Sequence, residues 1–214
     1  MTTILCYGDS NTWGMVPMMS LNDANRHDKA DRWPSVLEKT LGESVTVIAE
    51  GLNGRTTVFD DPIDGQHKNG LTYLLPCLES HAPLDLVVIM LGTNDTQTRF
   101  NLSPYDIASG AGLLVQMVTA NVRGQNGMAP EVLLVCPPLI RASYLFADPF
   151  AGAPEKSEQL HEHYRNIADR FGCHYLNAEE CATASHIDGI HLDAQQQHEL
   201  GLAVASYAKS ILAC

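Results

Sequence analysis

Ser10, which lies just after a short apolar stretch near the start of the chain, is the first candidate for a catalytic nucleophile. Residues 4–7, Ile-Leu-Cys-Tyr, have the length and composition of a buried strand, and Gly8, Asp9 and Ser10 follow at once. A strand ending in small residues leaves the hydroxyl at the carboxyl edge of a sheet, where ligands bind in open α/β folds. We therefore expect Ser10 to be a nucleophile, although Gly-Asp-Ser-Asn is also ordinary turn chemistry, with Asp9 as the turn former.

A serine nucleophile needs a base, and His191 is the histidine best placed to provide one. Asp188 lies three residues before it, so a tight turn can bring the carboxylate against the imidazole. The carboxylate would fix the ring tautomer and stabilise the imidazolium, while the other ring nitrogen faces Ser10. An Asp-x-x-His pair is weak evidence by itself, because chance and surface solvation explain most such pairs.

Two further glycine-bearing segments follow expected strands. Residues 51–54 come after the strand expected at 45–49, and residues 92–95 come after the apolar run 84–91. The carboxyl ends of parallel strands share one edge of a sheet, so both segments should face Ser10. Their backbone N–H groups could then stabilise a developing negative charge. We expect Asp95, in the second segment, to brace its loop by hydrogen bonds.

The elements that must position these residues alternate regularly along the chain. The remaining strands are expected at 132–136 and 173–176, and the helices at 33–41, 71–81, 104–122, 155–171 and from about 194 to 212. Pro76 is expected to interrupt the second helix, and Asp193 to cap the last one with Gln196 as its capping-box partner. This alternation predicts an α/β fold: a three-layer α/β/α sandwich around a five-stranded parallel sheet. Residues 1–214 are expected to form a single domain, because no linker or repeat divides them.

Charge and composition limit the classes of partner. Lys and Arg number 13 against 25 Asp and Glu, which gives a formal net charge of −12 and disfavours nucleic acid and anionic membrane surfaces. No apolar run approaches the roughly 20 residues that span a bilayer, and residues 1–3 show no secretory leader. The cysteines form no Cys-x-x-Cys pair, so we expect reduced thiols and a cytoplasmic protein. These cysteines are Cys6, Cys77, Cys136, Cys173, Cys181 and Cys214.

Four short segments occur in a defined order over nearly the whole chain. They are Gly8-Asp9-Ser10, Gly51-x-x-Gly54-x-Thr56-Thr57, Gly92-x-Asn94-Asp95 and Asp188-x-x-His191. Together they resemble the motif blocks of the SGNH (GDSL-type) hydrolase superfamily. The resemblance implies a flavodoxin-like fold, with Ser10 as nucleophile, His191 as base and Asp188 as its orienter. It also implies an oxyanion hole made by the N–H groups of Ser10 and Gly54 and the side-chain amide of Asn94.

A narrower set of segments is similar to the bacterial arylesterase/acyltransferase subgroup: residues 4–10, 12–14, 50–52, 55–57, 60–62 and 84–96. Members hydrolyse short-chain esters, and some transfer the acyl group to alcohols or peroxide. Some assemble as octamers, so the resemblance implies a small-molecule ester substrate, a homo-oligomer, and neither cofactor nor metal. Gly54 replaces an expected alanine, and Asn11 replaces an expected apolar residue. A polar residue beside the nucleophile speaks against acyl transfer, which favours a dry channel.

Several alternatives remain open at this stage. A carbohydrate O-acetylesterase of the same superfamily is the second candidate, and a binding protein with a decayed site is another. A metal hydrolase could use His186, Asp188 and His191, although no second ligand cluster accompanies them. Nucleotide-binding fingerprints are absent from the sequence. The loop 141–154, which contains Tyr144, Phe146 and Phe150, could line an acyl pocket or form an oligomer contact.

Overall fold

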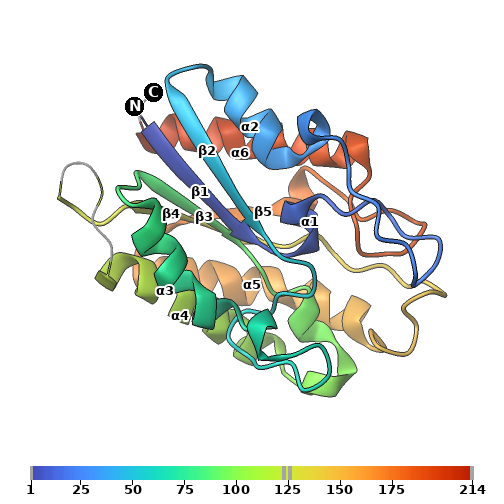
Figure 1. The fold of residues 1–214 in the computed structure, drawn as a ribbon. Coiled ribbons are helices and arrows are strands. Elements are labelled where there is room, and N and C mark those ends of the chain that lie inside the picture. Colours follow the sequence, from blue (N-terminus) through green and yellow to red (C-terminus); the bar gives the residue numbers. More distant parts are fainter. Residues whose placement is uncertain (1, 122–123, 125–126, 213–214) are drawn as a thin grey trace.

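The computed structural model describes residues 2–121, 124 and 127–212. Its centre is a parallel five-stranded sheet in the order β2-β1-β3-β4-β5 (Figure 1). The strands are β1 (Thr2–Gly8), β2 (Val45–Gly51), β3 (Leu86–Met90), β4 (Glu131–Cys136) and β5 (His174–Asn177). The predicted sheet is confirmed, and its order is that of flavodoxin-like folds, in which ligands bind where the strand order reverses, beside β1 and β3.

Helices cover both faces of the sheet. In Figure 1, α2 (Trp33–Leu41) and α6 (Ala194–Leu212) lie on one face, and α3 (Gly70–His81), α4 (Pro104–Asn121) and α5 (Ala153–Phe171) on the other. The predicted three-layer sandwich is therefore confirmed. A short helix, α1 (Ser10–Trp13), directly follows β1. Val122, which the sequence analysis placed at the end of the third predicted helix, lies outside the described residues.

The two cores follow from the alternation of side chains along each strand. In β1, Leu5 and Tyr7 pack with α3, α4 and α5, whereas Ile4 and Cys6 pack with α2 and α6. All of β3 is buried, as expected for a central parallel strand that is covered on both faces. The rigid sheet thus holds the ends of β1 and β3 in constant register, Gly8 beside Met90.

The interruption predicted at Pro76 is wrong, because α3 runs through this residue without a break. Proline lacks the N–H that would bind the carbonyl of Thr72, four residues earlier. Both residues are exposed, so water can bind that carbonyl. The buried residues on the opposite face, such as Leu74 and Leu78, hold the helix against the sheet.

The capping box predicted for the last helix forms only in part. Asp193 Oδ1 accepts the N–H of Gln196 at 2.9 Å, as a capping residue should. Gln196 does not return the bond to Asp193; instead its Oε1 accepts the N–H of Thr183 at 2.8 Å. The first turn of α6 is therefore fastened to the segment that leads into the loop with Asp188 and His191.

The cysteine thiols and the helix lengths bear on the predicted compartment. The five described cysteines are free thiols, and Cys214 lies outside the described residues. Within the described part of the chain, each helix is too short or too polar to cross a membrane.

Candidate active site

Ser10, His191 and Asp188 form a continuous line of hydrogen bonds. His191 Nε2 lies 3.0 Å from Ser10 Oγ, and His191 Nδ1 lies 2.6 Å from Asp188 Oδ2. The three side chains are buried, with Ser10 and His191 each 6% exposed. The structure thus brings together three residues that the sequence analysis selected from the two ends of the chain.

Ser10 is held at the carboxyl edge of the sheet by the short helix that it begins. Asp9 is the N-cap of α1, since its Oδ1 accepts the N–H of Asn11 at 3.0 Å. The helix packs directly on the end of β2, where a Cβ on Gly51 would lie 2.1 Å from the nitrogen of Trp13. Only glycine permits this approach, which fixes the first turn of α1 and with it the serine hydroxyl.

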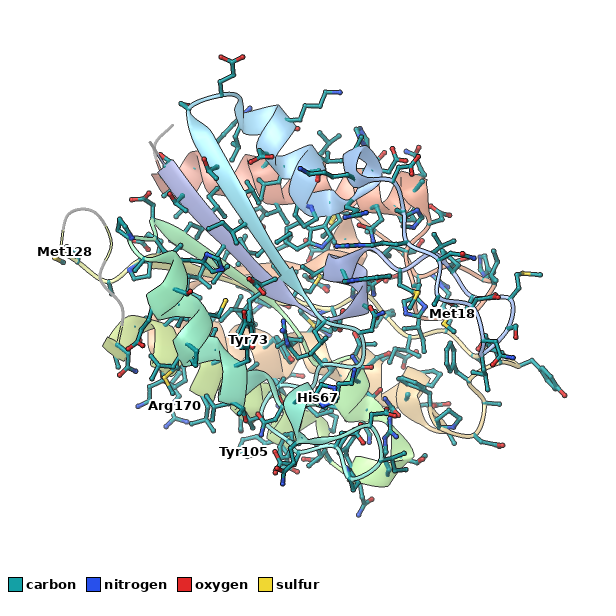
Figure 2. The ribbon with its side chains drawn as sticks, viewed as in Figure 1. Met18, His67, Tyr73, Tyr105, Met128 and Arg170 are labelled. Atoms are coloured by element: carbon teal, nitrogen blue, oxygen red, sulfur yellow. The ribbon has the colours of Figure 1, made fainter. Side chains whose placement is uncertain are left out.

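Asp188 accepts four hydrogen bonds inside the protein. Oδ1 accepts the N–H groups of Ile190 and His191, and Oδ2 accepts the N–H of Met18 at 2.7 Å besides the imidazole. Met18 lies on the loop that follows α1 (Figure 2). Burial disfavours the charged carboxylate, but the bond from His191 and the N–H donors outweigh it and hold the pKa of Asp188 below its ordinary value.

This arrangement determines which nitrogen of His191 can act as a base. An ionised Asp188 only accepts hydrogen bonds, so Nδ1 of the neutral imidazole must carry the proton. The lone pair of Nε2 then faces the hydroxyl of Ser10, 3.0 Å away. The geometry is that of a serine hydroxyl ready to transfer its proton to the ring.

The segments that hold Gly54 and Asn94 are tied to the end of β1. The N–H of Leu52 and Nη1 of Arg55 both donate to the carbonyl of Gly8, at 3.1 and 2.8 Å. Asn94, in the turn after β3, donates Nδ2 to the carbonyl of Arg55 at 3.0 Å. Both segments are therefore linked to Gly8, two residues before Ser10, directly or through Arg55.

The donors proposed for an oxyanion hole keep hydrogens free. Within the described part of the chain, no protein acceptor takes the N–H of Ser10 or Gly54. The amide of Asn94 has a second hydrogen, because Nδ2 donates only one to Arg55. Gly54 has φ of 76°, a left-handed conformation in which glycine is unstrained.

Asp95 fastens the next residues of the same loop. Its carboxylate accepts the N–H of Thr57 at 3.0 and 3.1 Å and the Thr57 hydroxyl at 2.5 Å. Burial raises the pKa of Asp95 to about 6, against the effect of the Thr57 bonds. The side chain thus braces a neighbouring loop, that of Gly54 and Thr57, rather than only its own.

The aromatic loop between β4 and α5 forms a cavity whose lining includes Ile190, the residue before His191. The ring of Phe146 lies 6.3 Å from that of His191 and 5.7 Å from that of Phe150. Both phenylalanines line a cavity of about 230 Å³, and Arg141 and Glu155 are among its polar residues. Tyr144, in the same loop, is 99% exposed at the surface.

Arg55 is a buried residue for which the sequence analysis proposed no role. It is 3% exposed, its Nη1 also reaches the carbonyl of Glu50, and its guanidinium lies 4.2 Å from the ring centre of Tyr7. A basic residue between a glycine and two threonines after a strand was the only signal. The side chain joins the carboxyl ends of β1 and β2 under the loop of Gly54.

Metal-ligating atoms gather at one place among the described residues, and neither Asp188 nor His191 belongs to it. Glu50, Cys77 and His81 have ligand atoms within 4.8 Å of one another. His81 Nε2 and Glu50 Oε1 lie 3.0 Å apart, and burial raises the pKa of the Cys77 thiol to about 12. Tyr73, labelled in Figure 2, lies one turn before Cys77 on α3. The described residues do not form the alternative metal site, in which His186, Asp188 and His191 would be the ligands.

Comparison with known proteins gives a consistent family and fold. The profile of the GDSL-like lipase/acylhydrolase family matches residues 6–199. The chain is similar to Est24, a carbohydrate acetylesterase from Sinorhizobium meliloti (41% identity, 99% of this chain and 100% of that chain, TM-score 0.93). It is also similar to the aryl esterase of M. smegmatis (39% identity, 99% and 100%, TM-score 0.94). A lipase/acylhydrolase from Enterococcus faecalis, 18% identical over 98% of this chain and 96% of that chain, shares the fold at a TM-score of 0.69. A comparison with curated protein sequences gave no match.

Proposed function

Because the chain belongs to the GDSL-like lipase/acylhydrolase family and is a carboxylic-ester hydrolase, we propose that it cleaves short-chain acyl esters through an acyl-enzyme. Ser10 is the nucleophile, His191 the general base, and Asp188 the residue that orients the imidazole. The observation that carries the proposal is the buried line of hydrogen bonds from Asp188 through His191 to Ser10. The unpaired N–H groups of Ser10 and Gly54, the second amide hydrogen of Asn94 and the cavity that Phe146 lines support it.

The proposed reaction uses each of these groups in turn. Ser10 Oγ attacks the ester carbonyl carbon while Nε2 of His191 takes its proton. The carbonyl oxygen becomes an oxyanion that accepts hydrogen bonds from the N–H groups of Ser10 and Gly54 and from Nδ2 of Asn94. The imidazolium, stabilised by Asp188, returns the proton to the leaving alcohol. Water then attacks the acyl-enzyme by the same proton route and releases the acid.

Replacement of the nucleophile tests this proposal. Ser10→Ala should abolish hydrolysis of p-nitrophenyl acetate in a folded protein and remove labelling by a fluorophosphonate probe. Ser20→Ala, at an exposed serine on the loop after α1, is the matched control and should keep both. Turnover retained by Ser10→Ala, or probe attached elsewhere, would contradict the mechanism.

A carbohydrate O-acetylesterase is the second candidate function. It is favoured by the 41% identity to a carbohydrate acetylesterase and by the polar residues Arg141 and Glu155 at the cavity. The ratio of kcat/KM for acetylated xylose to that for p-nitrophenyl acetate separates the two functions. A ratio above one would favour the sugar ester, and no detectable xylose deacetylation would favour the arylesterase function.

Transfer of the acyl group to alcohols or peroxide is part of the same proposal. The sequence-based argument against transfer was the polar Asn11 beside the nucleophile. Asn11 is 1% exposed and its amide is engaged inside the protein, so it adds no polarity to the site entrance. Product analysis with a competing alcohol measures the partition: ester product at low alcohol concentration supports transfer, and acid alone contradicts it.

We also propose that the chain self-associates through the loops around the site. Met19, Leu21, Tyr144 and Ile187 are 79%, 64%, 99% and 50% exposed, and an exposed apolar patch is typical of a protein contact. Light scattering on the purified protein should show an oligomer, and Tyr144→Ser should weaken it. A monomer at all concentrations would contradict this proposal. The cytoplasmic location stays a prediction.

A further inference from the structure

Asn11, the residue after the nucleophile, contacts the backbone on both sides of His191. Its Nδ2 donates to the carbonyl of Ile190 at 3.2 Å, and its Oδ1 accepts the N–H of Leu192 at 3.0 Å. A carbonyl can only accept and an N–H can only donate, so these partners determine the orientation of the amide. The side chain is 1% exposed, and both bonds are shielded from water.

The main chain of Asn11 is itself anchored to two helices. Its carbonyl accepts Nε2 of Gln197 at 3.0 Å, and Oε1 of Gln197 accepts the N–H of Trp33 at 2.9 Å. Gln197 is fully buried and lies in the first turns of α6, which begins shortly after His191. Residues in the first turns of α1, α2 and α6 are therefore joined by hydrogen bonds.

We propose that Asn11 is a positioning residue for ester hydrolysis: its carboxamide holds the two residues that flank His191 and so sets the distance between Nε2 and Ser10 Oγ. The inference rests on the proposed function, in which His191 is the base. Ser10 and Asn11 are consecutive residues of one helix, so the nucleophile and the carboxamide that holds the residues around His191 move together. An apolar side chain at this position could make neither bond.

The proposal predicts an effect on kcat rather than on substrate binding. Asn11→Leu keeps the branched shape of the side chain but leaves the Ile190 carbonyl and the Leu192 N–H without their partner. A displacement of about 1 Å of a catalytic group can cost about a hundredfold in rate, so kcat for p-nitrophenyl acetate should fall roughly ten- to hundredfold. KM should change little, because the carboxamide is buried and both of its polar atoms bind the backbone.

A double-mutant cycle distinguishes positioning from a general loss of stability. In a His191→Ala background there is no imidazole to position, so Asn11→Leu should have no further effect on residual hydrolysis. Val118→Ala, a buried truncation near the end of α4, is the stability control: it should lower the melting temperature but leave kcat near that of the wild type. Asn11→Ala, which also removes the carboxamide but adds no bulk, replaces Asn11→Leu if the latter does not fold.

Each outcome has a definite meaning. A kcat loss that disappears without His191 supports the positioning role. An Asn11 variant that is folded and keeps the wild-type kcat, or that loses the same factor with and without His191, overturns it. Ser10→Ala is measured in the same series: if it stays active the proposed function fails, whereas an inactive Ser10→Ala beside a fully active Asn11 variant contradicts only the role of Asn11.

Discussion

Asp188→Asn changes one oxygen of the carboxylate into an NH2 group, and the structure determines which one. If the NH2 replaces Oδ1, it faces the N–H groups of Ile190 and His191, and two backbone donors lose their acceptor. If it replaces Oδ2, it faces the N–H of Met18 and Nδ1 of His191. Nδ1 can then become the acceptor by a change of tautomer, which leaves only the Met18 donor unpaired.

The second orientation is favoured, because each unpaired buried donor costs about 1–3 kcal/mol. The folded variant should therefore be less stable than the wild type by about that amount at pH 7. In this orientation Nε2 of His191 carries a hydrogen and cannot take the proton of Ser10. The same change of tautomer in a serine protease lowers kcat about 10⁴-fold, equivalent to roughly 5.5 kcal/mol of barrier. We expect a similar loss in kcat with KM nearly unchanged.

Hydrolysis of p-nitrophenyl acetate at pH 7 to 8 and thermal melting check this prediction. Asp9→Asn is the matched control, since it is the same chemical change at a buried carboxyl of the same site; its amide oxygen can still cap α1. The control should stay within about tenfold of the wild type, well short of the loss expected from a wrong tautomer. The reasoning is refuted if folded Asp188→Asn also stays within about tenfold, because His191 would then not depend on the carboxylate for its tautomer.

Three further predictions concern the neighbours of this line. Asn94→Ala should lower kcat about 10²- to 10³-fold with little change in KM, because it removes one donor to the oxyanion; steady-state kinetics measure this. Burial raises the pKa of Asp9 from 3.8 to about 6, so between about pH 4 and 6 the unfolded chain ionises first and wild-type stability falls as pH rises. Denaturation across this range should show the wild type losing up to about 3 kcal/mol relative to Asp9→Asn. Phe146→Ala enlarges the cavity beside His191 and should raise kcat/KM for octanoyl relative to acetyl p-nitrophenyl esters by about tenfold.

Each of these has a control in the same site. Gln97→Ala, another buried polar residue near Asn94, should not reproduce the loss expected for Asn94→Ala. A stability difference between wild type and Asp9→Asn that is constant from pH 4 to 7 would show that Asp9 ionises normally. Tyr144→Ala changes an exposed residue of the same loop and should leave the acyl-chain preference unchanged. An unchanged preference in Phe146→Ala would show that the acyl group binds elsewhere.

The layers of the fold could be predicted because they depend on local patterns. An apolar run of strand length followed by Gly-Asp-Ser, repeated alternation with helices, and a stop at Gly42 each act within a few residues of the chain. The same locality explains Ser10 and Asp188-x-x-His191 as candidates, since a tight turn alone brings Asp188 to the imidazole. The interruption predicted at Pro76 was wrong for a reason that is not local. The face of α3 that meets the sheet decides that the Thr72 carbonyl, which Pro76 cannot bind, is exposed to water.

The remaining features join segments that are far apart in the chain, and no local pattern encodes them. The hydroxyl of Ser10 and the imidazole of His191 meet across 181 residues, and Asn94 reaches Arg55 across 39. Asn11 read alone is a polar residue in a turn; only the packed structure places Ile190 and Leu192 on either side of its amide. Local sequence patterns therefore determined the strands, the helices and the candidate catalytic side chains. Burial then paired those groups, because a hydrogen-bonding atom withdrawn from water must find its partner wherever the packing brings one.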